Sequence, residues 1–74
     1  MKTEKQLNNS IYLMYVIAEL YMKRHELGVE DFLKLDGQVK LLKFIADAPW
    51  VFDGLPDEEM LAEAERYVNA RLSD

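Results

Sequence analysis

The sequence contains no cysteine, two prolines, three glycines and one histidine among its 74 residues. Without cysteine the chain can form neither disulfides nor thiolate metal sites that would supplement a small core. A single histidine also excludes the paired-histidine spacing of common zinc sites. Half of the residues are hydrophobic, so the chain is expected to fold as one domain over residues 1–74. At this length only about 60% of the unfolded surface can be buried, so an isolated fold would be marginally stable.

Long hydrophobic runs and clustered cations are also missing. The longest apolar run, Ile11 to Ala18, is far shorter than the roughly 20 residues of a membrane helix. The amino end lacks the small-residue cleavage site of a secretory signal, so a cytoplasmic location is expected. The net charge of −5 comes from nine Lys and Arg against 14 Asp and Glu. This balance disfavours binding to the phosphate backbone of a nucleic acid.

The hydrophobic periodicity predicts an all-α bundle of three to four helices around a long central first helix. That helix is expected at about 8–27, after a frayed amino terminus at 1–6 and before a terminating Gly28. It is apolar over most of its circumference, and only a narrow strip is suited to water: Tyr12, Glu19, Lys23 and Glu26. A helix of this kind must be covered on several sides. Some of its large residues should therefore stay exposed if only three short helices cover it.

Three shorter helices are predicted after the first. A helix at 29–35 and another at 37–47 are expected on either side of a break at Asp36–Gly37, with Asp36 as the cap. The last helix is predicted at 56–72, with Pro56 at its first helical position. Acidic residues follow Pro56 and complement the positive end of the helix dipole.

No catalytic or metal-binding pattern stands out. His25 lies near the end of the first helix, where packing and a favourable dipole explain it. The carboxylates of the last helix surround the helix rather than converge, which is typical of a solvated face or of a surface for a basic partner. No nucleophile elbow, phosphate loop or dinucleotide turn is present. We therefore expect no enzyme activity, no cofactor, no metal and no small-molecule substrate.

The segment from Pro49 to Pro56 is the most unusual local feature, because it places three large apolar residues in a loop. Either Trp50 or Phe52 closes the open end of the bundle, or these residues are exposed anchors for a partner. Burial of Trp50 distinguishes the two readings.

The aromatic and Met-rich first helix adds two further candidates, Tyr15 and Met22, because core or interface packing explains such residues better than a cofactor groove. The predicted partner-binding residues are thus Trp50, Phe52, Tyr15 and Met22.

A helix-turn-helix is the alternative reading of residues 29–47. The two short helices and the break between them have roughly suitable lengths, and Lys40 and Lys43 would share the outer side of the second. None of the three arginines lies in that helix, which weighs against DNA recognition.

The chain also resembles a family of small bacterial proteins catalogued only as a domain of unknown function. The resemblance covers most of residues 10–72, and its matching stretches are Ile11 to Leu20, Leu42 to Ile45, Trp50 to Phe52, Asp57 to Met60, Glu63, Tyr67 and Val68. It implies a compact helical bundle without recognised catalytic residues, encoded beside enzymes of the effector type. By this likeness the protein would restrain or assist the product of a neighbouring gene.

These observations together favour a non-catalytic interaction module. We expect a homo-oligomer, such as a dimer, or a heterologous protein partner, with an antitoxin-like or inhibitory role as one form. We expect neither a nucleic-acid partner nor a membrane.

Overall fold

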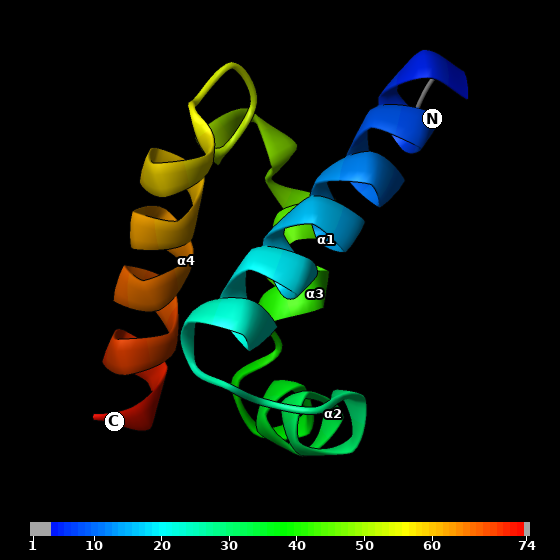
Figure 1. The fold of residues 1–74 in the computed structure, drawn as a ribbon. Coiled ribbons are helices and arrows are strands. Elements are labelled where there is room, and N and C mark those ends of the chain that lie inside the picture. The colour runs from blue at the N-terminus through cyan, green and yellow to red at the C-terminus, as the bar shows by residue number, and fades with distance from the viewer. Residues whose placement is uncertain (1–3, 74) are drawn as a thin grey trace.

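The structure, a computed structural model, describes the backbone of residues 4–73 and the side chains of residues 9–73. All regular elements in the described part of the chain are helices and none is a strand, so the predicted all-α fold class is confirmed. Its elements are α1 (Glu4–Arg24), α2 (Val29–Val39), α3 (Leu41–Asp47), the short 3-10 helix η1 (Pro49–Val51) and α4 (Asp57–Leu72) (Figure 1).

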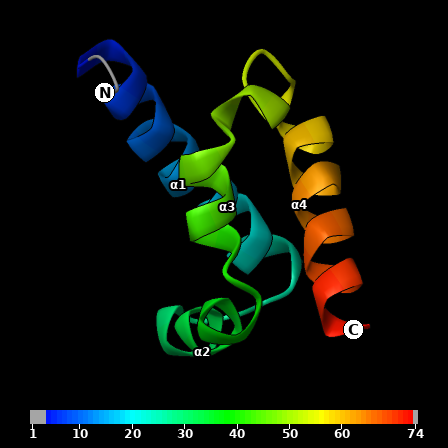
Figure 2. The same ribbon diagram turned by 180° about the vertical axis from the view of Figure 1, so that it is seen from behind.

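Helix α1 is the central element, as predicted, because it contacts each of the other four. Figures 1 and 2 show that α1 and α4 run in the same direction. Helix α3 runs in the opposite direction, behind α1 in Figure 1 and in front of it in Figure 2. Helix α2 lies across the end of the bundle where α1 stops. The η1 turn and the loop after it occupy the opposite end, where they lead the chain into α4.

The predicted boundaries of the first helix are wrong at both ends. Helix α1 begins at Glu4, so residues 4–6 are helical, and the rest of the predicted frayed segment lies outside the described residues. The helix ends at Arg24 because Glu26 adopts a left-handed conformation (φ 53°) and the Leu27 N–H donates to the Met22 carbonyl at 2.9 Å. This is the six-residue closure that ends many helices. Gly28 instead precedes α2 in an extended conformation.

The predicted break at Asp36–Gly37 is also wrong, because both residues lie inside α2. The chain turns at Lys40, which is left-handed (φ 60°) and is the only residue between α2 and α3. Asp36 still acts as a cap, but from six residues away: its Oδ1 accepts a hydrogen bond from the Leu42 N–H at 2.8 Å. That N–H belongs to the first turn of α3, where no partner within the helix exists.

Moving the break to Lys40 changes which residues of α3 face inward. Leu41 and Ile45 are buried, whereas Leu42 is half-buried. The twelve buried hydrophobic residues among residues 9–73 form one cluster, with contributions from every α-helix and from the loop after η1. Its members are Leu13, Ile17, Tyr21, Phe32, Val39, Leu41, Ile45, Phe52, Met60, Leu61, Ala64 and Val68.

The last helix begins one residue later than predicted. Pro56 is its N-cap, with an extended backbone (φ −62°, ψ 159°), and Asp57 is the first helical residue. The Pro56 carbonyl accepts hydrogen bonds from the N–H groups of Glu59 and Met60 at 3.0 and 2.9 Å. The acidic first turn, Asp57 to Glu59, is exposed and complements the helix dipole as the sequence predicted.

Candidate functional site

The loop after α3 divides its large apolar residues between the core and the solvent. Phe52 is completely buried and meets the ring of Phe44 edge-on at 5.9 Å between centroids. Trp50, on η1, is 73% exposed. Phe52 therefore closes the bundle, and its prediction as a partner contact is wrong because no atom of it reaches the surface. Trp50 has the exposure that a contact residue requires.

Helix α1 leaves one side of its apolar circumference uncovered. Ile11, Tyr12 and Tyr15 are 58%, 62% and 68% exposed, because α3 and α4 cover the opposite side, which carries Leu13 and Ile17. The prediction that large residues of this helix stay exposed is thus confirmed for the two tyrosines. Met22 is half-buried against the core, so it offers a partner only part of its surface.

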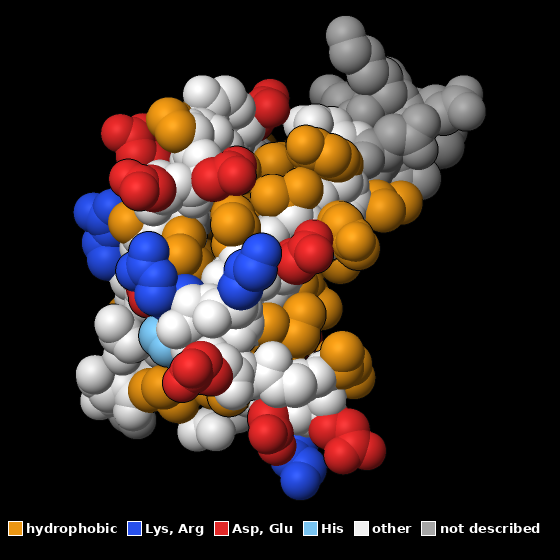
Figure 3. Space-filling view, viewed as in Figure 1, with side chains coloured by type: hydrophobic (Ala, Val, Ile, Leu, Met, Phe, Trp, Pro, Cys, Tyr) orange, Lys and Arg blue, Asp and Glu red, His pale blue; other side chains and the backbone are white. Residues whose placement is uncertain are grey.

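Helix α2 adds two exposed residues that sequence reasoning missed. Val29 and Leu33, one turn apart, are 64% and 54% exposed, while Phe32 between them is buried. In Figure 3 the hydrophobic side chains follow α1 and continue at the adjoining edge of α2. We call the five exposed residues on these two helices the apolar face: Ile11, Tyr12, Tyr15, Val29 and Leu33. The missed signal was the one-turn spacing of Val29 and Leu33 beside the inward Phe32.

A shallow groove of about 240 Å³ lies beside this face, between α1 and the start of α4. Half-buried Val16 and Leu20 give it an apolar floor, and Glu19, Lys23 and Asp57 surround it. An apolar centre within a polar rim is the usual make-up of a protein-binding surface.

His25 is placed in a structural contact between α1 and α4. Its Nε2 lies 2.8 Å from Oε2 of Glu65, and its ring stacks on Tyr21 with centroids 4.2 Å apart. Burial, and then the negative charge of Glu65, raise the pKa of Tyr21 above its ordinary value of 10.0. Among the described residues no group of three or more metal-ligating side chains is arranged to hold an ion. The contact joins the end of α1 to the middle of α4.

The geometry of residues 29–47 weighs against the helix-turn-helix alternative. A single residue joins α2 and α3, whereas the motif uses a turn of three or four residues. Helix α3 has only seven residues, and the ammonium of Lys43 on it is 2.7 Å from a carboxylate oxygen of Asp47. That hydrogen bond raises the pKa of Lys43, and the positive charge of Lys43 is balanced by Asp47 within the same helix. Lys40 and Lys43 do share one exposed groove, which also includes Arg71.

The acidic helix α4 carries its carboxylates singly around its surface. Glu63 pairs with Arg66, three residues further along the helix, at 2.7 Å. Glu65 is half-buried and contacts His25. Within residues 4–73 no helix is both long and apolar enough to cross a membrane.

Comparisons with known proteins add no relative: no family model, curated protein or solved structure matches this chain.

Proposed function

We propose that this protein is a non-catalytic interaction module that binds another protein chain, a second copy or a different protein, through the apolar face of α1 and α2. The observation that supports the proposal is the exposure of Ile11, Tyr12 and Tyr15 side by side on a helix that is otherwise the centre of the core. Scattered exposed hydrophobic residues are ordinary, whereas a contiguous group marks an interaction surface.

The chemistry of this face is that of an interface centre. Two tyrosines offer large rigid rings at a small entropic cost, and each keeps a hydroxyl for hydrogen bonding at the rim. Glu19 and Lys23 flank the rings on α1 and supply a polar border. Covering this face would also supplement the small core, whose isolated stability is expected to be low.

Trp50 is the second contact in the proposal. Its exposure on η1, at the end of the bundle away from α2, makes it a separate anchor that extends the bound area. Tryptophan is enriched among the few residues that carry most of the binding free energy.

The finer role follows from the resemblance described above. A protein encoded beside an effector-type enzyme and equipped with a binding face would act as an antitoxin-like or inhibitory partner in the cytoplasm. This role needs no catalytic residue in the chain itself.

The test compares Tyr15→Lys with Leu72→Lys, which places the same charge on an exposed leucine of α4. Sedimentation velocity at micromolar concentration should show association of the wild-type chain, or a co-purified partner after expression in the native cell. Either complex should persist in the Leu72 variant and dissociate in the Tyr15 variant, because a buried ammonium in the interface is costly.

Circular dichroism must show equal helicity in both variants, because Tyr15 makes little contact with the core. The proposal would be contradicted if the wild-type chain remained monomeric and co-purified with no partner that is lost from the Tyr15 variant.

A further inference from the structure

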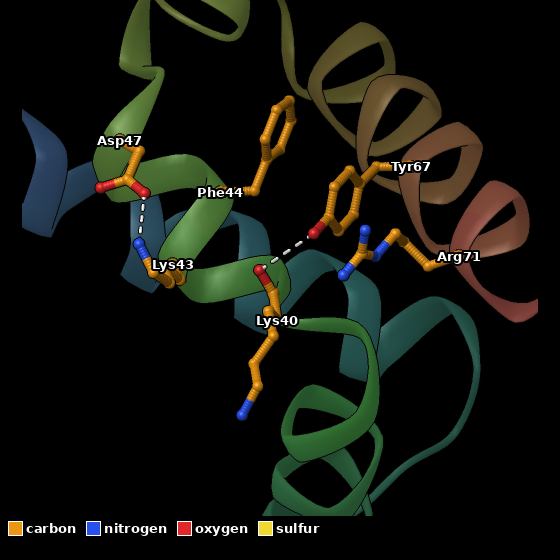
Figure 4. A pocket seen from close by; sticks show the side chains of 6 residues that line it. All are labelled: Lys40, Lys43, Phe44, Asp47, Tyr67 and Arg71. Carbon is orange, nitrogen blue, oxygen red and sulfur yellow. Dashed lines mark hydrogen bonds and ion pairs between the residues drawn. The ribbon is translucent and has the colours of Figure 1, made fainter.

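A groove of about 360 Å³ lies between α3 and the end of α4, on a different surface from the apolar face. Six residues line it: Lys40, Lys43, Phe44, Asp47, Tyr67 and Arg71 (Figure 4). Three cations and one carboxylate give it a net charge of +2, although the whole chain carries −5. No Lys or Arg lies between Lys43 and Arg66 in the sequence, so the groove gathers cations that the surrounding segments lack.

The aromatic wall of the groove is fixed by several contacts. The Tyr67 hydroxyl donates to the Val39 carbonyl at 2.7 Å, which ties α4 to the end of α2. Phe44 stacks on the Tyr67 ring with centroids 4.3 Å apart and an angle of 9° between the planes. The Arg71 guanidinium carbon lies 5.9 Å from the centroid of the same ring, and Figure 4 shows Tyr67 between Phe44 and Arg71.

The three cations of the groove differ in whether they already form an ion pair. Lys43 is paired with Asp47 at 2.7 Å. Within the described part of the chain, Lys40 and Arg71 take part in no ion pair. Arg71 is therefore an exposed guanidinium beside an aromatic ring. A planar guanidinium of this kind matches the two oxygens of a carboxylate or phosphate.

The charge around the groove separates these two anions. A nucleic acid would extend beyond the groove along α4, whose exposed acidic residues include Glu58 and Glu59 and whose half-buried Glu63 is paired with Arg66. These carboxylates would repel a continuous chain of phosphates. A short peptide brings only one or two carboxylates, and it also offers an apolar side chain for the half-buried rings of Phe44 and Tyr67.

We propose that the groove between α3 and α4 binds an acidic peptide segment of another protein, with a carboxylate held by Arg71 and Lys40 and a neighbouring apolar side chain packed on Phe44 and Tyr67. This second binding site is separate from the apolar face and does not depend on it. The full protein would then hold two chains at once, one on each surface.

The first experiment selects ligands without assuming a sequence. A phage library of random seven-residue peptides is panned on the wild-type chain and on Arg71→Gln. Panning on the wild type should enrich peptides with Asp or Glu next to an aromatic or aliphatic residue, and the Arg71 variant should not retain them. Peptides without acidic enrichment, or ones that bind both proteins equally, would overturn the proposal.

The second experiment measures affinity with the most enriched peptide, labelled with fluorescein, by fluorescence anisotropy. Arg71→Gln should weaken binding by about tenfold or more, because it removes a charge-assisted pair. Arg66→Gln removes the same charge from the same helix outside the groove and should change affinity by less than about twofold.

Lys40→Gly separates binding from folding. The variant loses an ammonium from the groove but relieves a left-handed backbone that glycine adopts more readily. It should unfold at a higher urea concentration than the wild type and yet bind the peptide more weakly. Equal binding by this more stable variant, or Arg71-dependent binding of a single-stranded oligonucleotide in place of the peptide, would refute the acidic-peptide assignment.

Discussion

At the scale of single residues, the segment after α3 shows how two aromatic residues that are two positions apart can have opposite roles. Phe52 is fully buried and Trp50 is 73% exposed. We expect Phe52→Ala to cost about 3–5 kcal/mol, which would remove most of the stability of so small a domain. Trp50→Ala should change the free energy of unfolding by less than about 0.5 kcal/mol. Urea denaturation followed by circular dichroism measures both, and a comparable loss in the two variants would contradict this division.

Gly37 offers a stabilising substitution. It lies inside α2 with nothing within 4 Å of the position that a Cβ would occupy, so alanine fits without a clash. Gly37→Ala should raise the free energy of unfolding by about 0.5–1 kcal/mol, because glycine loses more backbone entropy on folding.

The matched control is Gly54→Ala, which also meets no neighbour but has φ +83°. This substitution should destabilise the protein by about 1 kcal/mol, because an L-residue resists that conformation. Thermal unfolding that moved in the same direction for both variants would show that steric room alone decides.

At the scale of elements, the one-residue joint between α2 and α3 depends on Asp36. Its carboxylate accepts the Leu42 N–H at 2.8 Å, and Lys40 N–H donates to its carbonyl at 2.7 Å. Asp36→Ala should cost about 1 kcal/mol through loss of the cap, whereas Asp36→Asn keeps an acceptor and should lose less. Amide hydrogen exchange should show faster exchange at Leu42 in the alanine variant. Unchanged protection there would mean that packing alone holds α3.

The sequence predicted the helical elements better than their ends. Amphipathic spacing identified α4 to within one residue, because burial imposes the periodicity. It did not single out the inward side of α1, because that helix is apolar over most of its circumference. The two breaks were misplaced because glycine was taken as the terminating residue, while Glu26 and Lys40 adopt the left-handed conformation instead. The turn at Lys40 is favoured by the hydrogen bonds of Asp36 and by a tertiary contact, the hydrogen bond from Tyr67 to the Val39 carbonyl.

The candidate contact residues were predictable only in part. An excess of apolar circumference on the first helix indicated that Tyr15 would be exposed. Nothing in the local sequence separates Trp50 from Phe52, since which of them enters the core depends on how η1 turns the chain. The groove with Arg71 joins residues from two helices distant in the sequence and has no sequence signal of its own.

At the scale of the whole molecule, alkaline pH should weaken the fold through Tyr21. This residue packs between α1 and α2, stacks on His25, and has a pKa raised by burial and by Glu65. A raised pKa means that the folded state holds the proton more tightly than the unfolded state. The stabilisation is therefore complete below pH 10.0 and is lost as the pH rises through the folded-state pKa.

Tyr21→Phe should remove this part of the pH dependence. Urea denaturation from about pH 9 to about pH 11 should show a smaller decline for the variant than for the wild type. The absorbance of ionised tyrosine should also lose the component that titrates above pH 10.0. Identical declines in the two proteins would assign the alkaline loss to other groups.

The position of Trp50 on η1 has a practical consequence for experiments on this protein. It is the only indole in the chain, and water already surrounds most of it in the native state. Its emission spectrum should therefore shift little when the helices melt, and it should move to shorter wavelengths when another molecule shields the ring. Intrinsic fluorescence would thus report poorly on denaturation but would detect binding of another molecule at this end of the bundle.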